Sequence, residues 1–450
     1  MNITLSFFLF FSFLSFSSLY YLFDVFSAFN SSSNIFLTFY DNFSYNYLFS
    51  TTNLNFNLTY IYYFPFIYIF LLVTILAVLF CLSYNVNELI IFILYCKIIL
   101  LSGYVLFFTD SLVLFFISYE MLLIPSFFIL YKFAKTRRCV EAAYLMFFWT
   151  QFGALFLILS FLYLFFICES SSFWVISSFN FSNFEINFLF ICWIIGFGVK
   201  LPIWPFYGWL PKAHVEASTN FSIFLSGVLV KFAFFGLLKC LLALQTEPTF
   251  YFIYPFLTIG IVDAVFKLFY QIDLKKLVAY STVVEMHWLT ICVISGQSPL
   301  MLASFCMLIS HALLSANSFL LVDAINRRFK TRLITEISGI NFLCPKLFLI
   351  SLINLLIFLG FPGSIFFIAE FLFFSFFFDL FPILSLFLLI LLYLVGPTFF
   401  FKNWMNVLFG LSLNIFKKIP LDLNSKELII YGGLVFLMFW LGFSWQSFIF

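Results

Sequence analysis

Residues 195–239 read IGFGVKLPIWPFYGWLPKAHVEASTNFSIFLSGVLVKFAFFGLLK, and this stretch decides how the fold is interpreted. Lys200 and Lys231 lie inside apolar runs that are otherwise long enough to lie in a lipid bilayer. An ammonium group in hydrocarbon costs about 2.5–3.5 kcal/mol on insertion scales, so it is kept where it faces a protein interior or a wet cavity. Three prolines interrupt the first run, at Pro202, Pro205 and Pro211. Two buried lysines beside an interrupted helix indicate a path for ions.

The composition is that of a membrane protein. Of the 450 residues, 64% are hydrophobic and 9% are charged, whereas a soluble globular domain carries about 25% charged residues. The net charge is +2 and the basic residues fall in short clusters between apolar runs, which excludes a nucleic-acid-binding surface. The 78 Phe residues exceed what packing needs and point to an AT-rich coding genome such as that of an organelle.

Apolar runs of about 20 residues span a hydrocarbon core and are the unit to count. We count about 13 such runs and predict an all-α polytopic membrane protein. The polar stretch between the first two runs is predicted to be a loop. The runs cover residues 3–23, 60–84, 88–108, 110–133, 140–168, 186–207, 214–243, 248–271, 277–295, 300–323, 346–378, 382–401 and 428–448.

The loops between these runs alternate in charge. One set is basic and contains Lys132, Lys135, Arg137, Arg138, Lys212, Lys275, Lys276, Arg327, Arg328, Lys330, Arg332, Lys417 and Lys418. The other set is acidic and contains Asp110, Glu169, Glu185, Glu247 and Asp379. The positive-inside rule places the basic loops on the matrix or cytoplasmic face.

A second interrupted helix follows the first by five helices, in FLGFPGSIFFIAEF within run 346–378. Because five is odd, equivalent helices point in opposite directions, as in an inverted-topology repeat, and paired broken helices mark the ion path. We therefore predict two inverted five-helix repeats, each containing one broken helix. The predicted divisions are N-terminal helices with a polar loop at 1–84, the repeats at 88–243 and 248–401, and a loop with the C-terminal helix at 402–450.

Ionisable residues inside the runs are the candidate site. Glu120 lies near the middle of run 110–133, where it is either a hydrogen-bonded neutral acid or the partner of Lys200. A carboxylate that approaches and leaves a lysine alternately favours its charged and neutral forms, which makes the pair a proton switch. For Lys200 and Lys231, the alternative is that the side chain snorkels to the membrane surface. Lys239 lies near a helix end, where snorkelling is the expectation.

Histidines and further acids add to these ionisable residues, which together form a line of titratable groups along the chain. His214 opens the helix over 214–243, with capping and relay roles both open. Glu285 and His287 are two residues apart and therefore lie on different faces of a helix. We expect Glu285 to form an inward-facing set with Tyr280 or Ser281 instead. His311 is either a satisfied core histidine or a relay between the broken helices.

Four further charged residues lie in the apolar runs. Glu370 follows the second break and is the terminal carboxylate of the line. Asp263 and Lys267 are four residues apart on one helix face and read as a structural ion pair. Lys97 lies in the middle of its run, and nothing in the sequence assigns it a partner.

Motifs for covalent chemistry are missing from the sequence. It contains no phosphate-binding glycine loop, nucleophile elbow, H-E-x-x-H or dinucleotide fingerprint. The nine cysteines form no C-x-x-C pair. We therefore expect this chain to bind neither a metal nor a cofactor. A line of titratable groups conducts protons and does not transform a substrate.

Four segments resemble a known family: VKLPIWPFYGWLPKAHVEAS, VLVKFAFFGLLK, DLKKLVAYST and ISHALLSANSFLL. They are similar to the antiporter-like membrane subunits of proton-pumping NADH:ubiquinone oxidoreductase, respiratory complex I, over residues 118–370. The segment LPKAHVEA favours subunit 4 over subunits 2 and 5. The resemblance implies a helix bundle with two inverted repeats and no redox centre. It also implies a total of about 13–14 transmembrane helices, so residues 30–60 hold either the fourteenth helix or none. It also implies a modulating pair, a central proton carrier, a connecting histidine and an exit group, at Glu120 with Lys200, Lys231, His311 and Glu370.

The resemblance further implies where the chain works. NADH, FMN, iron–sulfur clusters and ubiquinone would be used by other subunits of the complex. The partners would be subunits 2 and 5 and lipids, in the inner mitochondrial membrane, with the chain encoded in the organelle genome. One departure is AYSTVVEM, which puts Glu285 where the family has a histidine and leaves a relay through His287 or Asp263 open.

Two other functions remain open at this stage. The first is a subunit of a multi-subunit cation/proton antiporter, which shares this fold and these lysines. The second is a structural membrane subunit that no longer conducts. The intramembrane charges argue against the second, because each costs free energy in the bilayer without a packing benefit.

Overall fold

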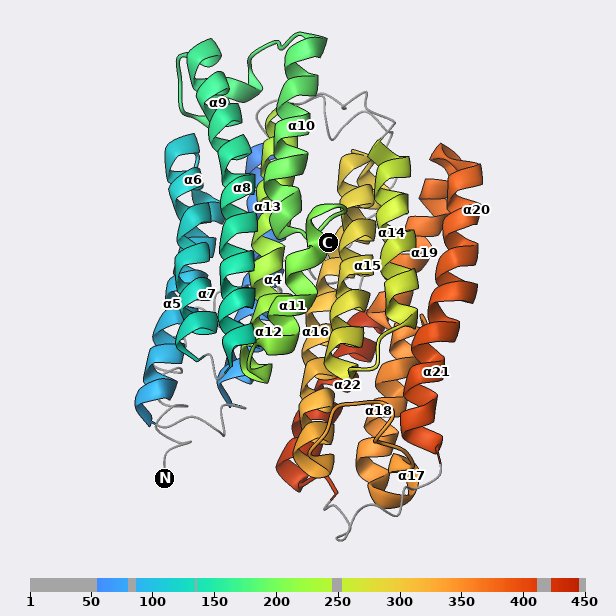
Figure 1. Cartoon of the computed structure of the whole chain (residues 1–450). Helices are drawn as coiled ribbons and strands as arrows, with labels where there is room; N and C mark the ends of the chain where they lie inside the picture. Colours follow the sequence, from blue (N-terminus) through green and yellow to red (C-terminus); the bar gives the residue numbers. More distant parts are fainter. Residues whose placement is uncertain (1–54, 80–85, 134–135, 245–252, 411–421, 445–450) are drawn as a thin grey trace, which may run out of the picture. The chain divides into compact units, whose positions relative to one another are not determined.

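Helix is the secondary structure of most residues in the computed structural model, which describes residues 55–79, 86–133, 136–244, 253–410 and 422–444 (Figure 1). Within those ranges the only β-pairing is two isolated bridges. Leu58–Phe450 form one unit, to which the following description applies, and Met1–Asn57 form another. The predicted helix at 3–23 and most of the polar stretch at 30–60 lie outside the described residues.

The first half of this unit runs from α4 to α13. Its elements are α4 Asn55–Leu79, α5 Val86–Phe108, α6 Leu112–Met121, α7 Leu123–Lys132, α8 Arg137–Cys168, α9 Phe173–Ser177, α10 Asn183–Lys200, η1 Phe206–Gly208, α11 Trp209–Glu216, α12 Thr219–Phe224, η2 Leu225–Leu229 and α13 Val230–Leu244.

The second half runs from α14 to α22. Its elements are α14 Ile253–Phe269, α15 Leu274–Ile294, α16 Ser298–Phe329, α17 Ile340–Leu343, α18 Pro345–Phe358, α19 Ile365–Leu380, α20 Pro382–Ile390, η3 Leu391–Val395, α21 Gly396–Phe409 and α22 Ser425–Phe443.

These helices confirm the predicted all-α polytopic membrane fold. Eight helices among the described residues are long and apolar enough to cross a membrane. Other predicted runs appear as shorter apolar helices because a break or an undescribed segment divides them, at Pro65–Leu79, Pro345–Phe358 and Pro382–Tyr393.

Prolines and glycines explain where the helices break. The predicted run 110–133 is one span made of two helices that meet at Leu122. The ring of Pro125 would clash with the carbonyl of Met121, four residues earlier, which interrupts the hydrogen-bond ladder there. The second predicted break separates α18 from α19, where Gly360 and Gly363 adopt φ values of +70° and +93° that favour glycine.

Two π-helical turns, η2 and η3, also interrupt the helices. One lies in the fifth helix of each predicted repeat, directly after the broken helix, along 219–244 and 382–409. A π-turn inserts one extra residue and is frequent at functional sites. The sequence reasoning did not predict either turn.

Contacts between loops agree with the predicted sides of the membrane. On the basic side, the Arg332 guanidinium donates to the Val215 carbonyl at 3.0 Å. On the acidic side, the Phe173 amide donates to the Asp110 carbonyl at 2.8 Å. Loops that the charge pattern assigned to one side are therefore in contact with each other.

The helices that carry the candidate residues are the most deeply buried. In α15 and α16, 94% of the apolar window is buried, and in the span Thr219–Leu244 the window is buried completely. α16 packs against α12, α15, α19 and α22. A helix that is apolar and buried on every side leaves its few charged side chains facing other helices.

Candidate functional site

The first cluster of buried charges joins α6 to the end of α10. The Glu120 Oε1 atom lies 3.6 Å from Lys200 Nζ, with the two side chains 19% and 2% exposed. The other Glu120 oxygen accepts a hydrogen bond from Gln151 Nε2 at 2.9 Å. Lys200 Nζ donates to the Tyr119 carbonyl at 3.0 Å and lies 3.4 Å from the centroid of its ring. The pair expected from the sequence therefore lies together, while its role as a proton switch stays a prediction.

The break between α10 and α11 places Lys200. α10 ends at Lys200 because Pro202 disfavours helical geometry in the residue before it and supplies no N–H. The carbonyl of Val199 accepts a hydrogen bond from Trp209 Nε1 at 2.8 Å, so α11 satisfies an acceptor at the end of α10. Such breaks are tolerated in a membrane where neighbouring groups meet the freed backbone atoms.

The second cluster contains Lys231, His311 and Glu285 from α13, α16 and α15. Lys231 Nζ lies 2.5 Å from His311 Nδ1, and His311 Nε2 lies 3.6 Å from Glu285 Oε2. The exposed fractions of the three residues are 0%, 1% and 6%. Only one hydrogen fits between the two nitrogens at that distance, so either the ammonium donates to a neutral imidazole or the imidazole donates to an amine. The arrangement can thus exchange a proton between lysine and histidine.

The π-turn η2 orients Lys231, which follows it by two residues. The Ser226 carbonyl in this turn accepts a hydrogen bond from Lys231 Nζ. Complete burial of the apolar window along this span leaves the ammonium no route to snorkel. The sequence-level alternative of snorkelling is therefore wrong for Lys231, and the 2% exposure of Lys200 excludes it there as well.

Glu285 faces the protein interior, and its titratable neighbour is on another helix. We predicted an inward-facing set of Glu285 with Tyr280 or Ser281, and the Glu285 and Ser281 side chains are both buried. The Ser281 hydroxyl donates to the Val278 carbonyl, and the ion-pair partner of Glu285 is His311 on α16. A partner on another helix depends on the packing angle, which sequence spacing within one helix does not contain.

The third cluster joins α19 to η3. Glu370 is 7% exposed, and its Oε2 atom accepts a hydrogen bond from the Tyr393 hydroxyl at 2.6 Å. A Cβ atom at Gly360 would lie 2.3 Å from the same oxygen. The carboxylate therefore packs directly against the backbone of the second break, where only glycine leaves room.

We predicted that His214 opens the helix over 214–243, and this prediction is wrong. The histidine lies in α11, and the next helix, α12, begins only at Thr219 with a cap from Ser218. Its ring is fully buried and stacks on Phe319, with centroids 4.8 Å apart. Both ring nitrogens lack a hydrogen-bond partner. His214 interacts electrostatically with Lys231 and His311, but its ring forms no hydrogen bond with the second cluster.

His287 ties the first break to the second half of the chain. Its Nε2 atom accepts a hydrogen bond from the backbone amide of Trp204 at 2.8 Å. Its Nδ1 atom lies 2.8 Å from the Val283 carbonyl and must donate to it. These partners assign the neutral tautomer with hydrogen on Nδ1. Both nitrogens are engaged by backbone, so this histidine holds the break and does not connect Glu285 to the line.

Asp263 and Lys267 form the predicted ion pair along α14, at 2.8 Å. The Tyr207 hydroxyl joins them, because it donates to Asp263 and accepts from Lys267 Nζ at 2.5 Å. Tyr207 lies in η1, inside the first break. This partly exposed group therefore fixes the break to α14, and it has no contact with Glu285.

Lys239 is buried, contrary to our expectation that it snorkels. Its exposed fraction is 4%. Its Nζ atom donates to the carbonyls of Phe107, at 3.1 Å, and of Thr109 at the end of α5. A cation at a helix C-terminus meets the unsatisfied carbonyls and the negative end of the helix dipole. Lys239 is thus a structural cation and lies outside the line.

The structure also shows contacts that the sequence did not reveal. Gln151 carries an amide side chain in the apolar run 140–168, so its polarity at mid-membrane depth was a signal that the sequence offered. Tyr393 carries no such signal among 23 tyrosines. Lys275 was assigned to a basic loop, yet it is 2% exposed and donates to the Ala217 carbonyl at the end of α11.

The three clusters do not join directly. No hydrogen bond or ion pair among the described residues runs from Lys200 to Lys231 or from Glu285 to Glu370, although Glu285 and Glu370 interact electrostatically. The same part of the chain contains no group of three or more His, Cys, Asp or Glu side chains arranged to hold a metal. The geometry fits storage and transfer of protons within each cluster.

Comparison with known proteins agrees with this arrangement. Residues 109–396 match the family described as NADH:quinone oxidoreductase/Mrp antiporter, transmembrane. NADH-ubiquinone oxidoreductase chain 4 of Paramecium tetraurelia is 36% identical over 334 residues, which are 73% of this chain and 70% of the relative. The chain belongs to this family. The chain 4 protein of Marchantia polymorpha is 32% identical over 80% of this chain and 72% of its own length.

A solved structure shows the same fold. A chain of respiratory complex I from Thermus thermophilus with bound NADH superposes with a TM-score of 0.70 and 19% identity, over 80% of this chain and 82% of that one. Together with the chain 4 relatives, this likeness identifies the present chain as an antiporter-like membrane subunit of complex I. It is hence part of an oxidoreductase complex. Fold and family therefore agree with the resemblance on which the sequence interpretation relied.

Proposed function

We propose that the chain translocates protons across the inner mitochondrial membrane as subunit 4 of complex I. The observation that carries the proposal is the buried group of Lys231, His311 and Glu285. A lysine ammonium in direct contact with an imidazole, beside a carboxyl group, is costly in a bilayer and contributes no apolar packing. It is useful where protons are taken up and released.

Glu120 and Lys200 are the proposed gate. Moving one charge against 100 mV costs about 2.3 kcal/mol. A continuously open proton path would let protons flow back across the membrane, so coupling needs gated steps. The 3.6 Å distance between the charged groups leaves a contact that small movements of the α10–α11 break can strengthen or weaken. The bond from Gln151 holds the carboxylate in place while the lysine moves.

The redox chemistry belongs to other subunits in this proposal. NADH, FMN, iron–sulfur clusters and ubiquinone are bound elsewhere in the complex, and quinone reduction drives this chain from a distance. The related subunits 2 and 5 and membrane lipids are the proposed neighbours, and the organelle genome is the proposed source of the chain. The enzyme activity is then that of a proton-translocating NADH:ubiquinone reductase, to which this chain contributes the translocation.

Replacing Lys231→Ala in the assembled complex tests the proposal. We expect normal assembly together with lower proton pumping and lower coupled turnover, since the central proton carrier is lost. Lys239→Ala is the matched control, because it removes another buried lysine of α13 that binds backbone carbonyls. The measurement is the proton-to-electron ratio during NADH oxidation. A normal ratio in the Lys231 variant would refute the proposal.

The same membrane preparation distinguishes the proposed function from the alternative of a cation/proton antiporter subunit. Sodium exchange in membranes that oxidise no NADH would favour that function. Co-purification of the chain with flavin and iron–sulfur proteins would favour the complex I assignment.

A further inference from the structure

The contact between Glu370 and Tyr393 joins a buried residue to one that reaches the molecular surface. Glu370 is 7% exposed, whereas Tyr393 is 37% exposed. We propose that Tyr393 controls the protonation of Glu370, by donating a hydrogen bond to the ionised carboxylate and by turning its ring into an adjoining surface groove when the carboxyl group becomes neutral. The proposal rests on the proposed function of the chain.

The hydrogen bond itself supplies the first argument. The Tyr393 hydroxyl donates to Glu370 Oε2 at 2.6 Å, a length typical of an O–H donor bound to a charged acceptor. Such a bond stabilises the ionised form of the acid and is weakened once the acid is protonated. Glu370 also interacts electrostatically with Glu285. Tyr393 is therefore the donor that favours the charged form of Glu370 over the neutral one.

The π-turn supplies the second argument. Tyr393 is the central residue of η3, Leu391–Val395. In the other predicted repeat the corresponding π-turn, η2, holds the carbonyl that binds Lys231. Each fifth helix thus uses a π-turn to bring a polar contact to a titratable residue of the line. A π-turn is less regularly bonded than an α-helical turn and is common at functional sites.

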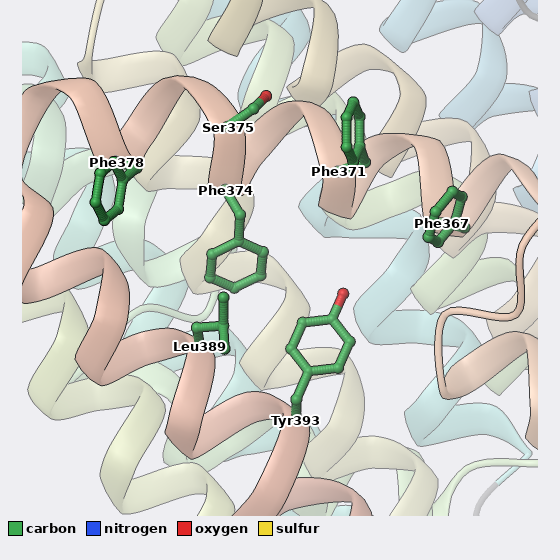
Figure 2. Close-up of a pocket in the computed structure, with 7 residues that line it drawn as sticks. All are labelled: Phe367, Phe371, Phe374, Ser375, Phe378, Leu389 and Tyr393. Carbon is green, nitrogen blue, oxygen red and sulfur yellow. The ribbon is translucent and has the colours of Figure 1, made fainter.

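The groove supplies the third argument, because it gives the ring space to move. It has a volume of about 510 Å³ and is lined by Tyr393, Leu389 and several phenylalanines of α19. Figure 2 shows the Tyr393 ring pointing with its hydroxyl end toward the helix that carries Phe371 and Phe374. The Phe374 and Tyr393 rings are 5.7 Å apart and inclined by 54°. One side of the Tyr393 ring is thus packed and the other faces open space.

Tyr393 is a positioning residue in this account and keeps its own proton throughout. When a relayed proton reaches Glu370, the neutral carboxyl group loses its strong attraction for the hydroxyl and the ring turns out. When Glu370 releases its proton, the negative charge draws the hydroxyl back. The cycle makes Glu370 bistable, so that it does not hold an intermediate affinity for protons.

Replacing Tyr393→Phe in the assembled complex tests the inference, since the ring is kept and only the hydroxyl is removed. We expect the ratio of ionised to neutral Glu370 to fall about ten- to a hundredfold, which is the effect of losing one hydrogen bond to a charged group. Infrared difference spectra report it as a stronger carboxyl C=O band, assigned to Glu370 by its loss in Glu370→Gln. We also expect a lower proton-to-electron ratio.

Ser375→Ala is the matched control, because Ser375 lines the same groove and its hydroxyl donates to the Leu372 carbonyl. It should leave both the infrared band and the pumping ratio unchanged. A Tyr393→Phe complex with a wild-type Glu370 band would overturn the inference, whatever its pumping ratio. If Lys231→Ala lowers pumping while Tyr393→Phe does not alter the band, this inference alone fails. If Lys231→Ala has no effect, the proposed function fails first.

Discussion

At the scale of single residues, burial turns each lysine into either a proton carrier or a structural cation, and its partners decide which. Lys239 donates to backbone carbonyls, which do not titrate, so none of these hydrogen-bond partners can exchange a proton with it. Lys231 faces an imidazole and Lys200 faces a carboxylate, and both of these partners can change their protonation. The two lysines of the line therefore differ from Lys239 in chemistry and not in burial.

Lys239→Met should separate these two kinds of lysine. The substitution keeps an apolar chain of similar length but leaves buried carbonyls at the end of α5 without a donor. We expect a loss of about 1–3 kcal/mol in stability, seen as less assembled complex and a lower melting temperature. The proton-to-electron ratio of the complex that does assemble should equal that of the wild type, and a reduced ratio would place Lys239 in the line.

Glu120→Gln tests the gate at the same scale. Glutamine is nearly isosteric and keeps an oxygen for the Gln151 amide, but it removes the charge that faces Lys200. We expect intact assembly and coupled turnover reduced by about tenfold or more, as for the loss of a charge-assisted contact. Glu141→Gln is a suitable control, because Glu141 is an exposed residue paired with Arg137 on the surface. Equal turnover in the two variants would contradict the gate.

Sequence reasoning succeeded for residues whose own chemistry is out of place in a membrane. Glu120, Lys200, Lys231, Glu285, His311 and Glu370 were all found in that way, and the structure brings them into three clusters. It missed the contact between His311 and Glu285, which lie on different helices. It also failed where the residue is common and unremarkable in type, as for Tyr393.

At the scale of elements, broken helices and π-turns place the clusters. The α10–α11 break is held from three directions. Tyr207 binds the Asp263–Lys267 pair, His287 accepts from the Trp204 amide, and Lys275 donates to the carbonyl that follows α11. The prolines that cause this break were visible in the sequence, but these supports lie far away along the chain. The breaks could therefore be predicted, and the contacts that position the first one could not.

Gly260→Ala should weaken that support. A Cβ atom at Gly260 would lie 2.2 Å from His287 Nε2 and 2.7 Å from Trp204 Cβ, so His287 must give up its bond to the Trp204 amide. We expect a destabilisation of about 1–3 kcal/mol, as for other overpacked sites, together with reduced coupling.

Gly432→Ala provides the contrast, since a Cβ atom there meets nothing within 4 Å. It should be neutral or stabilise α22 by about 0.5–1 kcal/mol. The measurement for both is the melting temperature of the purified complex. Equal melting temperatures would show that the contact at Gly260 does not support the break.

At the scale of the whole molecule, the line is made of separate clusters with gaps between them. The described residues provide no bonded path from Lys200 to Lys231 or from Glu285 to Glu370. Separate clusters suit a pump, because a continuous chain of bonds would let protons run back down the gradient. The all-α membrane fold followed from hydropathy, and the sides of the loops were predicted from charge. The gaps depend on how helices pack, and sequence patterns do not contain that information.

The most direct measurement of the central claim is a structure of the assembled complex in a membrane, resolved well enough to show side chains and waters. The account predicts ordered waters that bridge Lys200 to Lys231 and Glu285 to Glu370, so that the three clusters become one hydrated line at mid-membrane depth. Dry apolar packing in both gaps, with no water or polar side chain between the clusters, would contradict it and would favour a subunit that does not conduct.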